Sequence, residues 1–154
     1  MNKTTLFSSL KFMHKALLTG QIIFIAVIFY LVYSHTFLPI LASQQKIMQP
    51  IVLIFAAIAL FTGKKLYKSK LEQIQADINL SAKEKLIQYR SASILLWALV
   101  EAPSMVCGIC LLLSGNYAFL ALALVIIFYF GTLAPIKSET AVQLSITIEN
   151  LDEL

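Results

Sequence analysis

The sequence predicts an all-α membrane protein with four transmembrane helices arranged as two hairpins. Of its 154 residues, 59% are hydrophobic and 13% are charged, which is more apolar surface than a soluble domain of this size can bury. Four apolar segments approach the roughly 20 residues that a helix needs to cross a hydrocarbon core of about 30 Å. Basic residues gather in alternate connections, as they do in multi-pass proteins.

The four predicted spans cover residues 16–34, 47–63, 94–113 and 117–135. The second is the weakest, because its continuous apolar core covers only residues 50–62. A tight Ser114-Gly115-Asn116 turn separates the third span from the fourth. The whole chain, 1–154, is expected to be one membrane domain, in which residues 64–93 connect the two hairpins and residues 136–154 form a tail.

The lysines and arginines indicate the orientation. Three lysines precede the first span, the connection 64–93 holds six lysines and Arg90, and the outer loops hold only Lys46. Both termini and the connection are therefore expected on the cytoplasmic side of a bacterial inner membrane. The net charge of +4 is explained by this topology and by some affinity for anionic lipid. Nucleic-acid binding is not expected.

The connection between the hairpins is predicted to be helical. Ser81-Ala82-Lys83-Glu84 has the pattern of a capping box, in which the Ser and Glu side chains bond each other's backbone N–H. A helix should therefore begin at Ala82 and continue into the third span as one long helix, since no breaker precedes Pro103. In the tail, apolar residues alternate from Val142 to Ile148, which leaves a short strand and a surface-lying segment as alternatives.

Glu101 is the most informative residue, because an ionisable side chain inside an apolar span costs about 2.5 to 3.5 kcal/mol. Counting depth along the helices at about 1.5 Å per residue places Gln21, Thr19 and Tyr129 near its level. These side chains are the candidate partners of Glu101 in an intramembrane polar or ion site.

The helix around Glu101 also carries packing candidates. Ala98, Ala102 and Gly108 are small residues that recur at helical steps and would let another helix approach closely. Pro103 is expected to kink the helix and to leave the Leu99 carbonyl without its usual hydrogen bond. A bare acceptor would then lie one turn from the carboxyl.

Two functions are open for Glu101. A carboxyl hydrogen-bonded to Gln21 would join the first and third spans, which fits a structural or accessory membrane component. A proton or ion site is the alternative, because intramembrane carboxylates often mark ion pathways. The expected partners are the lipid bilayer and either a second copy of the chain or another membrane protein.

Enzyme chemistry is not expected. No phosphate loop, nucleophile elbow or dinucleotide fingerprint is present, and the sequence suggests no catalytic residue, metal or cofactor. Cys107 and Cys110 have the spacing of a metal or redox pair, but they lie at apolar depth without further ligands and are predicted to be packing residues. His14 and His35 are expected at the membrane interfaces.

An internal repeat is suggested by the alignment of residues 16–21, ALLTGQ, with residues 98–103, ALVEAP. Two parallel copies of a hairpin would explain it. With one carboxylate in the second copy, the layout resembles the duplicated proteolipid of rotary ATPases, and this resemblance implies a proton or sodium site. The likeness covers the topology and one residue, and the family's glycine ladder is absent.

A second resemblance covers most of the chain. The ALVEAP motif, the Ser114-Gly115-Asn116 turn and Pro135 with its polar tail are similar to small four-helix membrane proteins of Bacteroidota-type bacteria, whose function is uncharacterised. This resemblance implies the fold and a bacterial membrane, and it implies nothing about activity.

Overall fold

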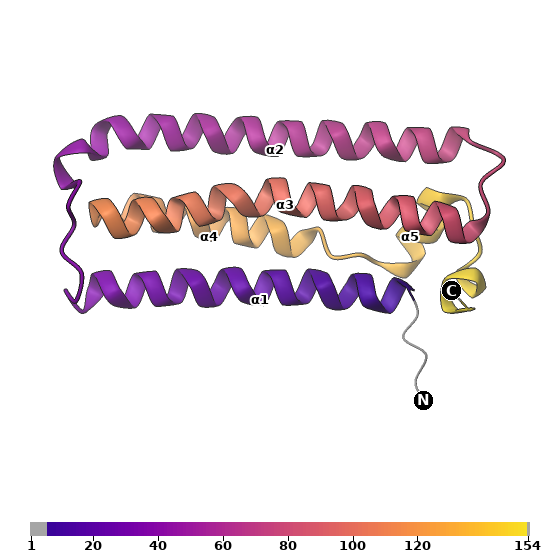
Figure 1. The fold of residues 1–154 in the computed structure, drawn as a ribbon, viewed down its shortest axis with the longest axis horizontal. Coiled ribbons are helices and arrows are strands. Elements are labelled where there is room, and N and C mark those ends of the chain that lie inside the picture. The colour runs from indigo at the N-terminus through magenta and orange to yellow at the C-terminus, as the bar shows by residue number, and fades with distance from the viewer. Residues whose placement is uncertain (1–5, 154) are drawn as a thin grey trace.

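The computed structural model describes residues 6–153, and within that range every regular element is a helix. This confirms the all-α prediction. The long helices are α1 (Leu6–Tyr33), α2 (Gln45–Ala76), α3 (Ala82–Ser114) and α4 (Tyr117–Thr132), and the short ones are η1 (Ala42–Gln44), α5 (Lys137–Leu144) and α6 (Ile148–Glu153). Consecutive long helices run antiparallel, so the start of α1, the α2–α3 connection and the tail lie at one end of the bundle (Figure 1).

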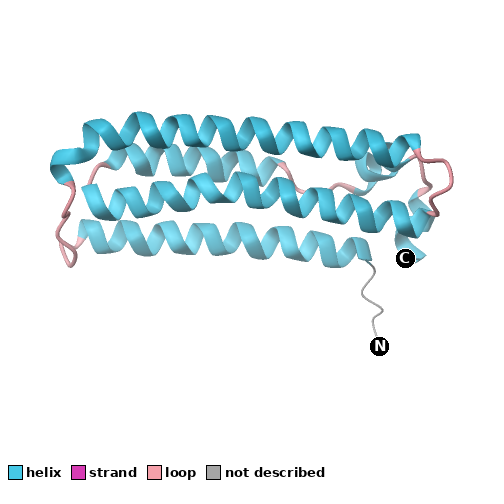
Figure 2. Cartoon of the chain, turned by 45° about the horizontal axis from the view of Figure 1, so that its top comes forward, coloured by secondary structure: helices cyan, strands magenta, loops and turns pink. Residues whose placement is uncertain are grey.

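Helix α3 is the centre of the bundle. It packs against α1, α2 and α4, whereas α1 and α2 are not packed against each other (Figures 1 and 2). Gly63 marks the close approach of α2, because a Cβ added there would lie 3.2 Å from Leu99 Cβ on α3. Of the two predicted hairpins, only α3 and α4 pack as a pair. The arrangement therefore gives no support to a parallel duplication, which predicts the same pairing in both halves.

The ends of α3 follow its local sequence. At its start, Ser81 N–H donates to Glu84 Oε2 at 2.9 Å, and Glu84 N–H donates to Ser81 Oγ at 3.3 Å. This confirms the predicted capping box. At its end, Gly115 has a φ of 68°, in the left-handed region that glycine adopts without strain. Asn116 then accepts a hydrogen bond of 3.0 Å from Ala118 N–H and starts α4.

Helix α4 is shorter than predicted. It ends at Thr132 rather than at residue 135, and the chain bends by 69° into α5. Pro135 explains the break, because it lacks an N–H and disfavours helical backbone at the preceding residue. The 16 residues of α4 are about 24 Å long at about 1.5 Å per residue. By length and composition, three helices could cross a membrane, or four if α4 and α5 form one bent span.

The tail folds into helices, so the strand considered for it is wrong. Helix α5 packs against α2 and α3, and α6 packs against α1. The anchors are Leu144 and Leu151, both fully buried. Ser145 ends α5 with a φ of 52°, and α6 begins three residues later. The tail therefore closes the end of the bundle where the chain begins.

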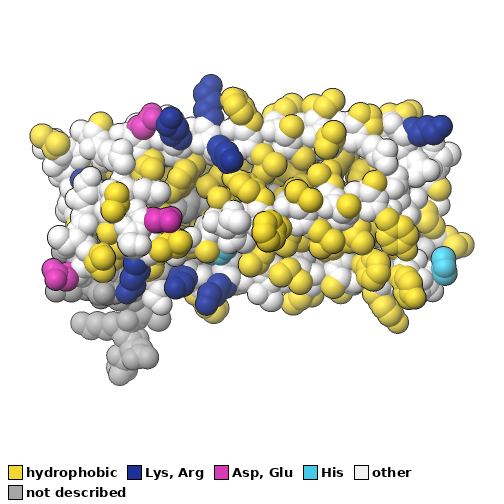
Figure 3. Space-filling model, turned by 180° about the vertical axis from the view of Figure 1, so that it is seen from behind, with side chains coloured by type: hydrophobic (Ala, Val, Ile, Leu, Met, Phe, Trp, Pro, Cys, Tyr) yellow, Lys and Arg dark blue, Asp and Glu magenta, His cyan; other side chains and the backbone are white. Residues whose placement is uncertain are grey.

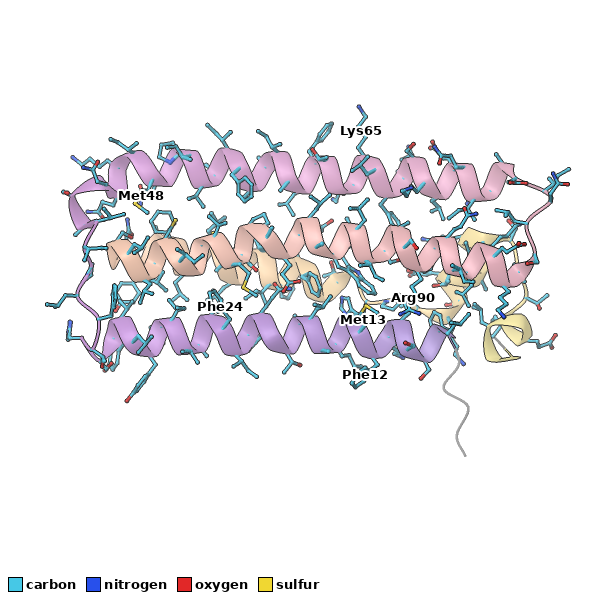
Figure 4. All side chains as sticks on the ribbon, in the orientation of Figure 1. Phe12, Met13, Phe24, Met48, Lys65 and Arg90 are labelled. Atoms are coloured by element: carbon cyan, nitrogen blue, oxygen red, sulfur yellow. The ribbon has the colours of Figure 1, made fainter. Side chains whose placement is uncertain are left out.

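Apolar side chains cover much of the outward surface of the long helices (Figure 3). Phe128 of α4 is 78% exposed and Phe61 of α2 is 70% exposed. In Figure 4, Phe12 points away from the bundle, whereas Phe24 points toward α3. Soluble monomers rarely expose apolar patches on this scale, so these outward faces suit lipid. Lysines gather near the end that holds the tail, the basic end, and Lys46 lies at the other.

Candidate functional site

Glu101 lies on the side of α3 that faces α1. Trp97 and Ser104, about one turn before and after it, both contact α1 side chains. Glu101 itself is only half-buried, which places its side chain at the edge of the α1–α3 contact. No hydrogen bond or ion pair joins its carboxyl to any of the residues that the structure describes. The carboxyl is therefore left without a partner among residues 6–153.

The polar contact between α1 and α3 is made by Gln21 and Ser104. Gln21 is fully buried, and Ser104 Oγ lies 2.9 Å from Gln21 Oε1 and 2.8 Å from the Glu101 backbone oxygen. One hydroxyl hydrogen cannot serve two acceptors well, and Gln21 Nε2 has no acceptor. Exchanging the amide oxygen and nitrogen resolves both problems, since Nε2 then donates to Ser104 Oγ and Ser104 donates to the Glu101 carbonyl.

Removing the two members of this pair is expected to have unequal effects. Ser104→Ala leaves the buried Gln21 amide without its hydrogen bond, so the free energy of unfolding should fall by about 1 to 3 kcal/mol. Gln21→Leu removes that amide while Ser104 keeps its bond to the Glu101 carbonyl, so the loss should stay under about 1 kcal/mol. Reversible unfolding by SDS in mixed micelles measures both. Equal losses of unfolding free energy in the two variants would contradict the hydrogen bonds assigned to Gln21 and Ser104.

The other two candidate partners lie apart from Glu101. Thr19 is exposed on α1. Tyr129 of α4 lies beneath Lys64 of α2, whose Nζ is 4.9 Å from the centroid of the Tyr129 ring, and the buried Tyr129 hydroxyl has no hydrogen-bond partner. Of the three predicted partners of Glu101, only Gln21 lies near it. Ser104 connects Gln21 to the backbone carbonyl of Glu101, and the Glu101 side chain takes no part in this contact.

The predicted packing residues divide between two faces of α3. Gly108 is buried against α1, where an added Cβ would lie 2.6 Å from Phe24 Cε1. Ala98 is exposed and Ala102 is half-buried, so these two small side chains lie on the outward side. Pro103 is buried within α3, which continues through it.

His14, expected at a membrane interface, is a buried polar residue that packs between helices of the bundle. It is 2% exposed, and its Nε2 donates to the Phe130 carbonyl at 3.1 Å. Its ring stacks on Phe130 at 4.8 Å and meets the edge of Trp97 at 5.0 Å between centroids. The imidazole thereby satisfies a carbonyl in the last turn of α4. A sequence signal exists, since His14 and Gln21 are seven residues apart and share one helix face.

Cys107 and Cys110 are free thiols buried in the core. Cys107 is fully buried and belongs to the hydrophobic core cluster. Among the described residues, no group of three His, Cys, Asp or Glu side chains could hold a metal ion. The thiols therefore act as packing groups in this structure.

The fold and the site together define a class of protein. It is a helical bundle with an apolar outer surface that suits lipid, and its central helix carries a carboxyl that has no partner among the described residues. Comparisons of the chain with protein-family models, with curated proteins and with solved structures found no match. The resemblances to small four-helix membrane proteins and to proteolipids accordingly remain predictions.

Proposed function

We propose that the chain is a multi-pass protein of a bacterial cytoplasmic membrane, with four spans and both termini in the cytoplasm. The fourth span is α4, and the bend of 69° into α5 lies at its cytoplasmic end. The separation of charge supports this orientation, because the basic end holds most of the lysines and the opposite end holds Lys46 (Figure 3). Positive charge is retained on the cytoplasmic side of multi-pass proteins.

Its proposed role is that of a structural or accessory component that contacts another membrane protein through the Glu101 face of α3. The partnerless carboxyl is the observation that carries this proposal. A carboxyl at that depth costs about 2.5 to 3.5 kcal/mol unless a polar group meets it. The exposed Ala98 and half-buried Ala102 beside it leave room for a second helix to approach.

A photo-crosslinker attached at Ala98→Cys tests this contact in native membranes. The native thiols Cys107 and Cys110 are buried, which favours labelling at the introduced cysteine. We expect a crosslink to one discrete protein. Its yield should be unchanged in Glu101→Gln, because the amide can still form hydrogen bonds. Its yield should be at least tenfold lower in Glu101→Leu. Leu124→Cys, on the exposed face of α4, is the matched control site. Crosslinks to lipid alone from both sites would overturn the proposed contact.

Proton or ion handling by Glu101 is the alternative function. A carboxyl with no internal partner is free to bind and release a cation, and Ser104 and Gln21 offer polar groups within one turn. Infrared difference spectra of wild type against Glu101→Gln in lipid nanodiscs separate the two functions. A carboxyl band that stays constant from acidic to alkaline pH favours the structural role. A reversible band change that responds to sodium or to membrane potential favours ion handling.

A further inference from the structure

A cavity of about 160 Å³ lies beneath the break between α4 and α5. It exists because α4 stops at Thr132 and the chain turns by 69°, so α5 lies across the basic end instead of continuing the span. Side chains of α2 and α3, the linking segment 133–136 and α5 form its walls. The cavity is separate from Glu101, which is not among its lining residues.

Hydrogen bonds hold the walls of this cavity in place. Tyr67 of α2 donates to Gln143 Oε1 of α5 at 3.2 Å, and Thr140 of α5 donates to the Tyr89 hydroxyl of α3 at 3.3 Å. The rings of Tyr67 and Tyr89 meet edge to face, 6.3 Å apart between centroids. Because α5 is bonded to both α2 and α3, the cavity is preformed.

The lining favours a positively charged ligand. Tyr67, Tyr89, Trp97 and Glu139 are among the residues that line the cavity, and no lysine, arginine or histidine is. Tyr89 and Trp97 are almost fully buried, so only a small part of each ring borders the cavity, and Tyr67 is the more accessible aromatic side chain. Glu139 lies in the first turn of α5, where it offsets the positive end of that helix.

We propose that this cavity binds an organic ammonium group. Aromatic faces attract such cations, and quaternary ammonium ligands are commonly held in aromatic cages. At about 30 Å³ for each water-sized group, a volume of about 160 Å³ holds about five non-hydrogen atoms. That size fits one alkylammonium head group.

The two sources of such a group are a soluble amine and the head group of phosphatidylethanolamine. Trp97 lines the cavity and is the one tryptophan of the chain, so its fluorescence reports directly on occupancy. The first titration uses tetramethylammonium chloride and the full-length chain in nanodiscs of phosphatidylglycerol, a lipid that carries no ammonium group. The neutral control is tert-butanol, which has the same number of non-hydrogen atoms.

We expect a saturable fluorescence change with tetramethylammonium that sodium chloride does not reproduce. Glu139→Gln should weaken binding about tenfold, and Tyr67→Leu about three- to thirtyfold, whereas Tyr67→Phe keeps the ring and should bind nearly as the wild type does. Glu72→Gln, an exposed carboxylate on α2, is the matched control. Glu139 is exposed, so its substitution should leave the fold intact, which circular dichroism verifies.

An equal response to tert-butanol, no response to either compound, or unchanged binding in Glu139→Gln would each overturn the proposal. The source is decided by repeating the titration in nanodiscs that contain phosphatidylethanolamine. Loss of tetramethylammonium binding there identifies the lipid head group as the ligand. Unchanged binding identifies a soluble amine.

Discussion

Replacing Trp97 by alanine is expected to lower the free energy of unfolding by about 3 to 5 kcal/mol. Trp97 is 1% exposed, the largest of the fully buried side chains. It packs edge-on against the His14 ring of α1 and forms one wall of the cavity below α4. Its removal would merge the vacated volume with that cavity and leave His14 supported on one side only.

Unfolding of this variant by SDS in mixed micelles must be followed by far-ultraviolet circular dichroism, because the substitution removes the one tryptophan. Phe128→Ala is the matched control. It also deletes a large aromatic side chain, but one that is 78% exposed on α4, where lipid replaces the lost contacts. We expect its loss to stay under about 1 kcal/mol. Similar losses in both variants would show that the core around Trp97 is not tightly packed.

The helix ends were predictable where a local signal marks them. The capping box at Ser81 and the turn at Gly115 involve residues within four positions of each other, so the sequence pattern contains the whole interaction. The end of α4 was not predicted correctly, although Pro135 is present in the sequence. Hydropathy extends the apolar segment to residue 135, whereas the helix ends at Thr132. Pro135 opposes a longer helix, because its ring would clash with the carbonyl of Gly131 and it disfavours helical backbone at Ala134.

Helix packing could not be predicted because the outward and buried faces of the helices are similarly apolar. In water, the apolar face of a helix points to the core. Here Ile54 and Phe128 face outward while Ile25 and Phe130 face inward, so composition does not distinguish the faces. The position of α3 between α1 and α2 was therefore not predictable from hydropathy.

The depth of the candidate site residues along the bundle was predicted better than the direction in which their side chains point. The sequence predicted a contact between Gln21 and the Glu101 carboxyl, whereas the structure pairs Gln21 with Ser104, three residues further along α3. His14 and Trp97 have the same sequence separation as that observed pair. One residue changes the depth by about 1.5 Å but turns the side chain by about a quarter of a turn. The partner of Gln21 was therefore missed even though its level in the bundle was nearly right.

Gly108→Leu is expected to push α1 and α3 apart and to lower the free energy of unfolding. A Cβ at residue 108 would lie 2.6 Å from Phe24 Cε1 and 2.9 Å from Ile25 Cδ1, well inside the separation of about 3.5 to 4.0 Å that carbon atoms prefer. Leucine adds three more carbons at the same place. Overpacking of this kind typically costs about 1 to 3 kcal/mol, and it opposes a gain of up to about 1 kcal/mol in helix propensity.

Gly20→Leu separates these two effects, because it makes the same chemical change in α1 at a position where an added Cβ meets nothing within 4 Å. It should leave the free energy of unfolding unchanged or slightly higher. Gly108→Ala should be milder than Gly108→Leu, since the atoms that a lone Cβ meets are the outer ends of the Phe24 and Ile25 side chains. Spin-label distances between α1 and α3 should increase in Gly108→Leu alone. If Gly108→Leu proved as stable as Gly20→Leu with an unchanged distance, the two helices could not approach as closely as the structure requires.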